Sequence, residues 1–224
     1  MKRFVPMIII LAVIITAFSS CKVSGPTVVG SNGNAYEMVT GEDGGRALDA
    51  NGNLIVASKD ADGNEVTEVL TEKYLIIDDD KLMAPAYDYE VPKEFKVESS
   101  EAADPLLVNE NGKLQIHIMD KTKAVAEMGG YEKYVKKTYQ SSVAVGIAVS
   151  EIENVTIADV PMQRFSMNLQ DDDGSPMVGY GYFVKANNRI LLITVAAVDG
   201  EITDVSQADA EVGKIDFINP EITE

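Results

Sequence analysis

The stretch from Val178 to Val198 constrains the fold more than any other part of the chain. It consists of two apolar runs, VGYGYFV and ILLITVAAV, separated by the polar break KANNR. Asn accepts a positive φ more readily than most residues, so the pair Asn187-Asn188 predicts a tight hairpin turn. The second run is almost continuously apolar, which is typical of a central strand covered on both faces. The stretch therefore predicts an antiparallel hairpin at the centre of the core.

Shorter patterns on either side of the hairpin predict the rest of a folded domain. Leu114, Ile116 and Ile118 alternate with more polar residues, which indicates a half-buried strand over residues 113–119. Helical spacing predicts one helix over 130–141, with room for an extra turn before it, and a second over 204–217. Further strand-like segments lie at residues 89–97, 143–149, 155–158 and 164–169. Strands in runs joined by tight turns predict an α+β fold, with one antiparallel sheet of about six strands flanked by two or three helices.

Residues 89–219 also show a likeness to a known family. The likeness is carried by Val91-Pro92 with Phe95, Tyr131 and Tyr134, the run VPMQRF at 160–165, both arms of the hairpin, and Ile215-Asp216-Phe217. In these features the segment resembles the PsbP/Mog1/DcrB-like superfamily. The resemblance implies an antiparallel sheet flanked by helices and a binding or assembly role without catalysis. It transfers no functional residue.

The N-terminus has the features of an export signal. Lys2 and Arg3 precede a short apolar run that is followed by small residues. The run is shorter than the roughly 20 residues of a comfortable transmembrane helix. Its end, Ser19-Ser20-Cys21, resembles the lipobox of bacterial lipoproteins, although Phe18 stands where that family usually has Leu. The alternative is a plain signal peptide or membrane anchor that happens to end in cysteine.

The lipobox resemblance implies a specific location. It implies removal of a signal peptide over residues 1–20 and attachment of lipid to Cys21, the only cysteine of the chain. The protein would then sit on the cell membrane, held by its lipid and facing outside the cytoplasm. The remaining domain would contain no disulfide, although it would fold where disulfides can form.

Residues 21–88 differ in composition from the segment that follows them. From residue 22 to 88 the chain contains no Phe, and it carries 13 acidic against 5 basic residues. Such a composition buries too little apolar surface to offset the entropy of ordering the chain. We therefore expect a flexible acidic tether, spanning on the order of 45 Å as a coil. It would carry a folded domain formed by residues 89–224.

Runs of acidic residues suggest cation binding at first sight. The residues at 60, 62 and 64 resemble the start of a calcium loop, but Glu65 and Thr71 stand where that loop needs Gly and Glu. A solvated turn is the expected structure there. The triplets Asp78–Asp80 and Asp171–Asp173 are also expected to be solvated turns.

Four single residues are candidates for a functional site. His117 is the only histidine, which argues against a zinc site or a Ser-His-Asp triad, and its strand phase predicts the more polar face. Arg164 is expected to form a surface ion pair with a neighbouring strand. Gly179 and Gly181 alternate with tyrosines, so we expect them to permit close packing under a helix.

The charge of the chain argues against nucleic acid as a partner and singles out one basic region. Without Lys2 and Arg3, 17 basic residues remain against 36 acidic ones, a formal net charge of −19. A chain of this charge repels polyanions on average. Five lysines nevertheless gather around the first predicted helix: Lys121, Lys123, Lys133, Lys136 and Lys137. They form either an ordinary solvated helix surface or a docking face for an anionic partner, such as a protein.

No catalytic motif stands out from this sequence. The chain has no G-x-S-x-G elbow and no phosphate-binding loop of the Walker or Rossmann type. We therefore expect no cofactor and no enzymatic activity. The sequence favours a lipid-anchored extracytoplasmic binding or assembly module. The alternative is a cell-surface hydrolase that uses paired carboxylates, since acidic residues occur throughout the chain.

Overall fold

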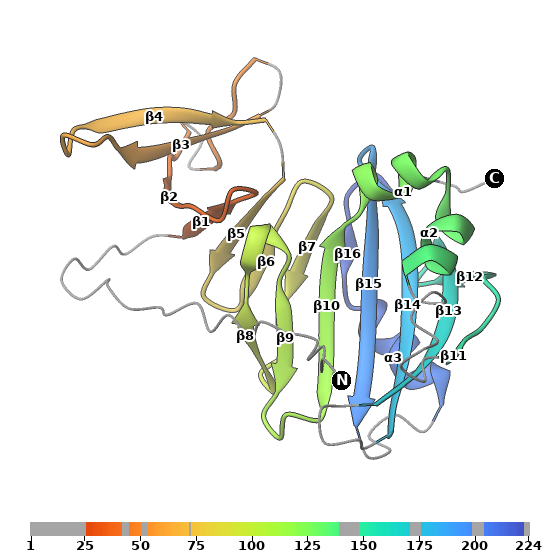
Figure 1. The fold of residues 1–224 in the computed structure, drawn as a ribbon. Helices are drawn as coiled ribbons and strands as arrows, with labels where there is room; N and C mark the ends of the chain where they lie inside the picture. Colours follow the sequence, from red (N-terminus) through yellow and green to blue (C-terminus); the bar gives the residue numbers. More distant parts are fainter. Residues whose placement is uncertain are drawn as a thin grey trace, which may run out of the picture.

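The computed structural model describes residues 26–41, 45–50, 53–71, 73–138, 148–170, 176–198 and 204–221. Within these residues the fold is α+β, with two antiparallel sheets and three α-helices (Figure 1). The predicted fold class is confirmed. The prediction of one sheet of about six strands is wrong, because there are two sheets of eight strands each.

The first sheet combines strands from both ends of the described chain. Its strand order is β16-β7-β6-β5-β1-β2-β3-β4, and β16 (Asp216–Phe217) pairs with β7. The other seven strands, in chain order, are β1 (Thr27–Gly30), β2 (Ala35–Met38), β3 (Leu54–Lys59), β4 (Glu65–Leu70), β5 (Tyr74–Asp78), β6 (Lys81–Met83) and β7 (Tyr87–Glu90).

These seven strands correct the prediction of a flexible tether over residues 21–88, in the part that the structure describes. The apolar residues of this segment are few, but they fall within short strands, and in β1, β2 and β3 buried positions alternate with more exposed ones. Leu54, Val56 and Ile76 are fully buried in a hydrophobic cluster of their own. Gly33 and Gly63, with φ of 79° and 83°, close the turns between β1 and β2 and between β3 and β4. Placement of the apolar residues therefore matters more here than their number.

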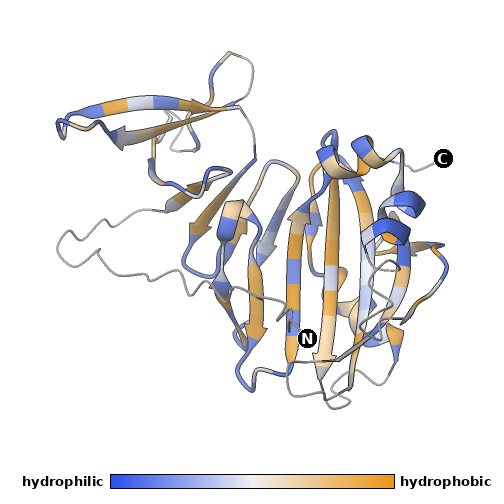
Figure 2. Ribbon diagram, viewed as in Figure 1, coloured by the Kyte–Doolittle hydropathy of each residue, from blue (hydrophilic) through white to orange (hydrophobic). Residues whose placement is uncertain are grey.

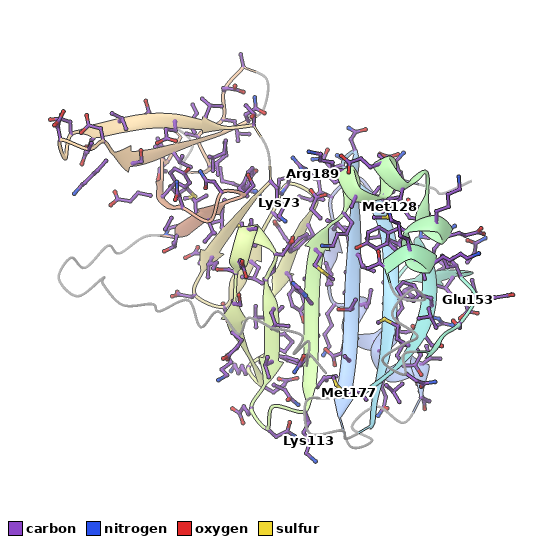
Figure 3. All side chains as sticks on the ribbon, in the orientation of Figure 1. Lys73, Lys113, Met128, Glu153, Met177 and Arg189 are labelled. Atoms are coloured by element: carbon purple, nitrogen blue, oxygen red, sulfur yellow. The ribbon has the colours of Figure 1, made fainter. Side chains whose placement is uncertain are left out.

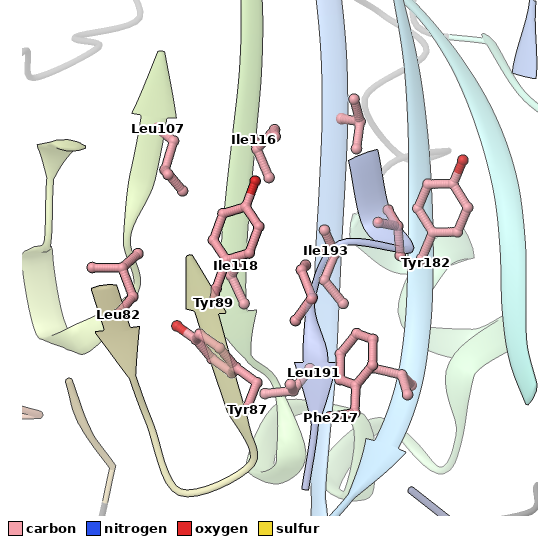
Figure 4. Packing of buried hydrophobic residues seen from close by; sticks show 14 of the residues in the cluster. Leu82, Tyr87, Tyr89, Leu107, Ile116, Ile118, Tyr182, Leu191, Ile193 and Phe217 are labelled. Carbon is pink, nitrogen blue, oxygen red and sulfur yellow. The ribbon is translucent and has the colours of Figure 1, made fainter. Parts of the chain in front are cut away.

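The predicted domain boundary at residue 89 is also corrected. Leu75, Leu82 and Tyr87 belong to the same hydrophobic cluster as Ile116 and Ile193 from the second half of the chain. Figure 4 shows the side chains of β6 and β7 packed against those of β10 and β15. The two sheets thus share one core, and the chain does not divide at residue 89.

The second sheet is formed by residues 95–198. Its strand order is β11-β13-β14-β15-β10-β9-β8, and β12 pairs with β13 outside this path. The strands are β8 (Phe95–Ser99), β9 (Leu106–Asn109), β10 (Leu114–Asp120), β11 (Ala148–Val149), β12 (Glu153–Ile157), β13 (Val160–Gln170), β14 (Pro176–Ala186) and β15 (Arg189–Val198). A short 3-10 turn at Glu101–Ala103 connects β8 to β9.

The hairpin expected at the centre of the core is confirmed. β14 and β15 pair in register from Met177↔Val198 to Ala186↔Arg189. Asn187 and Asn188 adopt φ of 45° and 61°, the left-handed pair that a two-residue turn of this twist requires. Figure 2 shows hydrophobic colouring along most of β15. β10 pairs with its far side, so β15 is an interior strand.

The side chains of β15 point alternately into two separate hydrophobic clusters. Leu191, Ile193 and Val195 face the first sheet, whereas Leu192 faces the opposite side. Leu192 is fully buried, as its sequence pattern predicted. The continuous apolar run of this strand is therefore explained by cover on both faces.

Three helices cover the two faces of the second sheet. α1 (Thr122–Met128) and α2 (Tyr131–Thr138) lie on the face of Leu192, and α3 (Val205–Val212) lies on the other face. The first predicted helix corresponds to α2 as far as the structure describes it, and the extra turn expected before it is a separate helix, α1, which is followed by Gly129 and Gly130 with φ of 77° and 117°. The second predicted helix stops at Gly213, because residues 216–217 join the first sheet as β16.

Candidate functional site

The five lysines predicted as a docking face all lie on or next to the α1–α2 pair. Lys121 is the N-cap residue of α1, and Lys123 follows within that helix. The others are exposed residues of α2. We call the surface formed by Lys121, Lys123, Lys133, Lys136 and Lys137 the lysine face.

The sequence of α2 explains why its lysines point outward. Tyr134 and Val135 are buried against the sheet, and Lys133, Lys136 and Lys137 occupy the exposed positions between and after them. Both Lys136 and Lys137 lie in the last helical turn, where positive charge is favourable beside the helix C-terminus. The amphipathic pattern that predicted a helix thus also fixes the direction of its charges.

Four aromatic rings hold the lysine face on the sheet. The ring of Tyr131 lies 4.9 Å from that of Phe183, and Tyr134 meets the same ring edge-on at 5.9 Å. Phe183 in turn stacks on Phe165 of β13 at 5.7 Å. Such contacts add to the area buried by the rings and fix their orientation. The lysines are therefore presented from a firmly packed support.

Part of the lysine face surrounds a shallow, open depression of about 390 Å³. Its lining residues are Glu127, Met128, Lys133, Lys136 and Lys137. Met128 lies at the end of α1, beside α2 (Figure 3). The combination of three cationic side chains with one carboxylate and one apolar side chain has a net positive charge, which suits an anionic surface that carries some apolar groups.

A second polar cluster, not expected from the sequence, joins the two sheets. Lys73 Nζ lies 2.6 Å from Asp104 Oδ1, and Arg189 Nη1 lies 2.7 Å from Asp120 Oδ2. The backbone N–H of Asp120 donates to Asp104 Oδ1 at 3.0 Å, which links the two ion pairs. Lys73, just before β5, and Arg189, at the start of β15, line the same small cavity, and both are labelled in Figure 3. We call these four residues the inter-sheet cluster.

The inter-sheet cluster encloses very little space. With Tyr87 and several alanines, it lines a cavity of about 10 Å³, close to the lower limit for one water molecule. Tyr87 is 2% exposed, and its hydroxyl has no hydrogen-bond partner among the residues that the structure describes. Burial, together with the charges of Asp104 and Asp120, raises the pKa of Tyr87 and keeps the phenol protonated. The cavity admits no substrate, so the cluster serves to tie the sheets together.

The Asp120 carboxylate of the inter-sheet cluster is held as an anion. Burial by itself would raise the pKa of Asp120, but the hydrogen bonds from Thr122 and Arg189 lower it overall. Thr122 donates to Asp120 Oδ1 from both its hydroxyl, at 2.6 Å, and its backbone N–H, at 3.0 Å. A carboxyl held in this way is a poor general acid. The paired-carboxylate chemistry of a hydrolase therefore gains no support from Asp104 and Asp120.

His117 is less exposed than its strand phase predicted. It shares a face of β10 with Met119, and Met119 is buried under the helices in the cluster of Leu192. Burial lowers the pKa of His117, with a further lowering from Lys121 and Lys73 that Asp104 opposes. The imidazole is therefore neutral at neutral pH. His117 thus lies on the face of β10 that its strand phase predicted, beside Gln115 and Met119, and the burial of Met119 shows that helices cover part of that face.

Arg164 forms the predicted cross-strand ion pair, but its side chain is only 14% exposed. It contacts Glu153 of β12 at 2.7 Å and Asp209 of α3 at 2.6 Å. The hydroxyl of Tyr182 donates to the same Asp209 carboxylate at 2.8 Å. The two contacts with Asp209 hold α3 on the sheet, and the contact with Glu153 ties β12 to β13, so Arg164 is a structural residue and not a simple surface pair.

The two glycines of β14 behave partly as predicted. A Cβ atom placed on Gly181 would lie 2.2 Å from Phe165 Cζ, so this position does require glycine for close packing. The packed group is a ring from the neighbouring strand β13, and the prediction that a helix would be the neighbour is wrong. Gly179 is also buried.

The predicted acidic turns are confirmed where the structure describes them. Asp60 accepts hydrogen bonds from the backbone N–H groups of Asp62 and Asn64, both at 2.9 Å, within the β3–β4 turn. Asp79 has φ of 50° in the turn between β5 and β6. Within the described part of the chain, no group of three or more His, Cys, Asp or Glu side chains is arranged to hold a metal ion. Cys21 and the triplet Asp171–Asp173 lie outside the described residues.

Comparisons with known proteins identify no relative. Neither the models of protein families nor the curated proteins gave a match to this sequence. In the residues that the structure covers, no helix is both long enough and apolar enough to span a membrane.

Proposed function

We propose that this protein is a lipid-anchored, extracytoplasmic binding or assembly module without catalytic activity. Its lysine face would dock an anionic surface of a protein partner. The observation that carries this proposal is the placement of Lys133, Lys136 and Lys137 around one shallow depression, on a chain whose formal net charge is −17. A local positive surface on an acidic protein attracts an acidic partner while the remaining surface repels wrongly oriented ones.

The anchoring part of the proposal rests on the N-terminal sequence. The basic start, the short apolar run and Ser19-Ser20-Cys21 form the pattern of a lipoprotein signal. The likeness of residues 89–219 to the PsbP/Mog1/DcrB-like superfamily remains part of this proposal. An antiparallel sheet flanked by helices is consistent with that likeness, and it supports a binding role more than a catalytic one.

Replacing Cys21 by Ala tests the anchor. The variant should be released from membranes or accumulate as an unprocessed precursor, because no thiol remains to receive the lipid. Membrane fractionation and gel migration of the full chain report both outcomes. A variant that fractionates and migrates like the wild-type protein would show that Cys21 carries no lipid.

Charge reversal tests the lysine face. In the full chain, Lys133, Lys136 and Lys137 are all replaced by Glu. The matched control replaces Lys93, Lys96 and Lys113, which lie on or near β8 and β10, and has the same net charge. Because all six charge changes are on the surface, we expect both variants to fold. The face variant should retain at least about tenfold less partner protein, or about 1.4 kcal/mol of binding free energy.

The measurement is a pull-down from detergent-solubilised membranes of the source cells at low and high salt. Proteins held through the lysine face should be captured by the wild-type protein and by the control at low salt. They should be lost at high salt, because exposed charges are screened. Equal capture by the two variants would show that any partner binds elsewhere.

A further inference from the structure

The outermost strands of the two sheets differ in how well they are protected. β16 and β11 have two residues each. β8 carries Lys96 and a register shift between Val97 and Ser99, and β12 holds Glu153 in its ion pair with Arg164. Short length, lysines and bulges are the devices that keep sheet edges from pairing with other chains.

β4 lacks all of these devices. Its six residues, EVTEVL, contain no Pro and no Lys, and they pair with β3 in unbroken register. Four of the six residues, including both glutamates, are exposed, none is buried, and Val69 is 46% exposed. Figure 1 shows the β3–β4 hairpin extending away from the second sheet, with β4 on its outer side. In the part of the chain that the structure describes, β4 is therefore the long edge most open to pairing.

The turn between β3 and β4 shows which backbone N–H and C=O groups of β4 point away from β3 and could pair with another strand. The N–H of Asp60 donates to the carbonyl of Asn64 at 3.0 Å, so these two residues form a hydrogen-bonded pair. Such pairs alternate along an antiparallel ladder, which places Val66, Glu68 and Leu70 opposite β3 as the bonded residues. The backbone groups of Glu65, Thr67 and Val69 consequently point away from β3.

The outward-pointing backbone groups of Glu65, Thr67 and Val69 are complementary to the same groups of a second, antiparallel β4 strand. We infer that a second copy of the chain adds its own β4 to this edge, antiparallel, about a two-fold axis at Thr67. Thr67 then faces the Thr67 of the other copy, Glu65 faces Val69, and Val66 faces Glu68. Isologous pairing of this kind is the commonest way in which identical chains associate.

Charge selects this register over its neighbours. Shifting the pairing by one step in one direction places Glu68 opposite Glu68 of the other copy, and like charges directly opposite destabilise a sheet. Shifting it one step in the other direction sets the turn residues 62–64 opposite residues 68–70 of the other copy, which leaves only residues 65–67 to pair as strand. The register centred on Thr67 pairs residues 65–69 of both copies without opposing two carboxylates. Each exposed Val69 also gains a neighbour.

A single cysteine at position 67 tests the inference. The test uses the full chain with Cys21→Ser, so that Thr67→Cys introduces the only thiol. Bonded pairs across an antiparallel ladder lie about 5.5 Å apart between Cα atoms, within the range of a disulfide. Under mild oxidation most of this variant should migrate as a covalent dimer on a non-reducing gel.

The matched control is Glu65→Cys in the same Cys21→Ser chain. Glu65 is exposed on the same face of β4, but in the proposed register the two copies of residue 65 are offset by four residues, or about 13 Å. Its cross-linking should be at least tenfold slower. Equal rates at 65 and 67, no dimer at 67, or adducts of residue 67 with a different protein would overturn the inference.

A second variant keeps the inference testable without a disulfide. Thr67→Pro removes an N–H that points away from β3, and proline is tolerated at such edge positions. The wild-type chain in detergent should sediment with the protein mass of two copies, and Thr67→Pro with that of one. A wild-type chain that sediments as one copy would contradict the proposed dimer.

Discussion

Leu192→Ala is expected to lower the free energy of unfolding by about 2–5 kcal/mol, the usual cost of truncating a large buried side chain. Leu192 is fully buried between Met119, Phe183 and the helices α1 and α2. Truncation removes apolar surface from the core and leaves a cavity that the packed rings cannot fill. Denaturant unfolding of the full chain measures the loss.

Leu48→Ala provides the control for this prediction. Leu48 has the same side chain but is 51% exposed. Changes at exposed positions usually stay within about 0.5 kcal/mol. If the two variants unfold at the same denaturant concentration, the face of the second sheet under α1 and α2 is not part of the stable core. His117 would be an unsuitable control, because it is half-buried beside Met119.

Gly181→Ala is expected to lower the free energy of unfolding by about 1–3 kcal/mol, although it adds only one methyl group. The added Cβ would lie 2.2 Å from Phe165 Cζ and 2.4 Å from Phe165 Cε1, far inside van der Waals contact. Phe165 cannot move aside freely, because its ring is stacked on Phe183. Thermal or denaturant unfolding of the variant measures the effect.

The combination of Gly181→Ala with Phe165→Leu separates overpacking from other causes. Leu lacks the ring that meets the new methyl group, so the double variant should lose less stability than the sum of the two single variants. Contacting residues commonly show coupling of about 0.5–3 kcal/mol. Strict additivity of the two losses would mean that the collision with Phe165 is not what destabilises Gly181→Ala.

The sequence predicted the centre of the second sheet because local pattern and burial agree there. Asn187-Asn188 favoured a tight turn with positive φ. The continuously apolar run after it indicated a strand covered on both faces. The strand over 113–119 was predicted for the same reason, since its alternation is regular. The face of His117 was predicted correctly, but the alternation did not show that its neighbour Met119 would be buried under α1 and α2. The sequence of one strand does not show which other elements will cover it.

The first sheet could not be predicted from composition. Val28, Leu54 and Ile76 are separated by long polar stretches, and each strand is too short to indicate burial by itself. Their common cluster exists only after β1, β3 and β5 have been brought together. Tyr87 and Tyr89 supply further buried area through contacts with strands that come much later in the chain. The average polarity of the segment that forms β1 to β7 therefore did not indicate that a few of its residues would form a core.

The lysine face and the inter-sheet cluster also differ in whether the sequence could predict them. The lysine face was predictable, because Lys133, Lys136 and Lys137 lie within one helix and their spacing sets their direction. The inter-sheet cluster joins Lys73, Asp104, Asp120 and Arg189, which are far apart in the sequence. None of these four residues lies in a motif. The ladder between β10 and β15, together with the packing of the two sheets, brings them together.

The pairing of β16 with β7 has a consequence for how the chain acquires its structure. Phe217 and Tyr87 stand opposite each other in the ladder, so the first sheet is completed by almost the last described residues. Tyr87 and Tyr89 leave the ribosome well before the strands that bury them. Contacts between such distant segments slow folding and lengthen the time for which apolar surface is exposed. The early strands of the first sheet therefore remain incompletely paired until β16 has been synthesised.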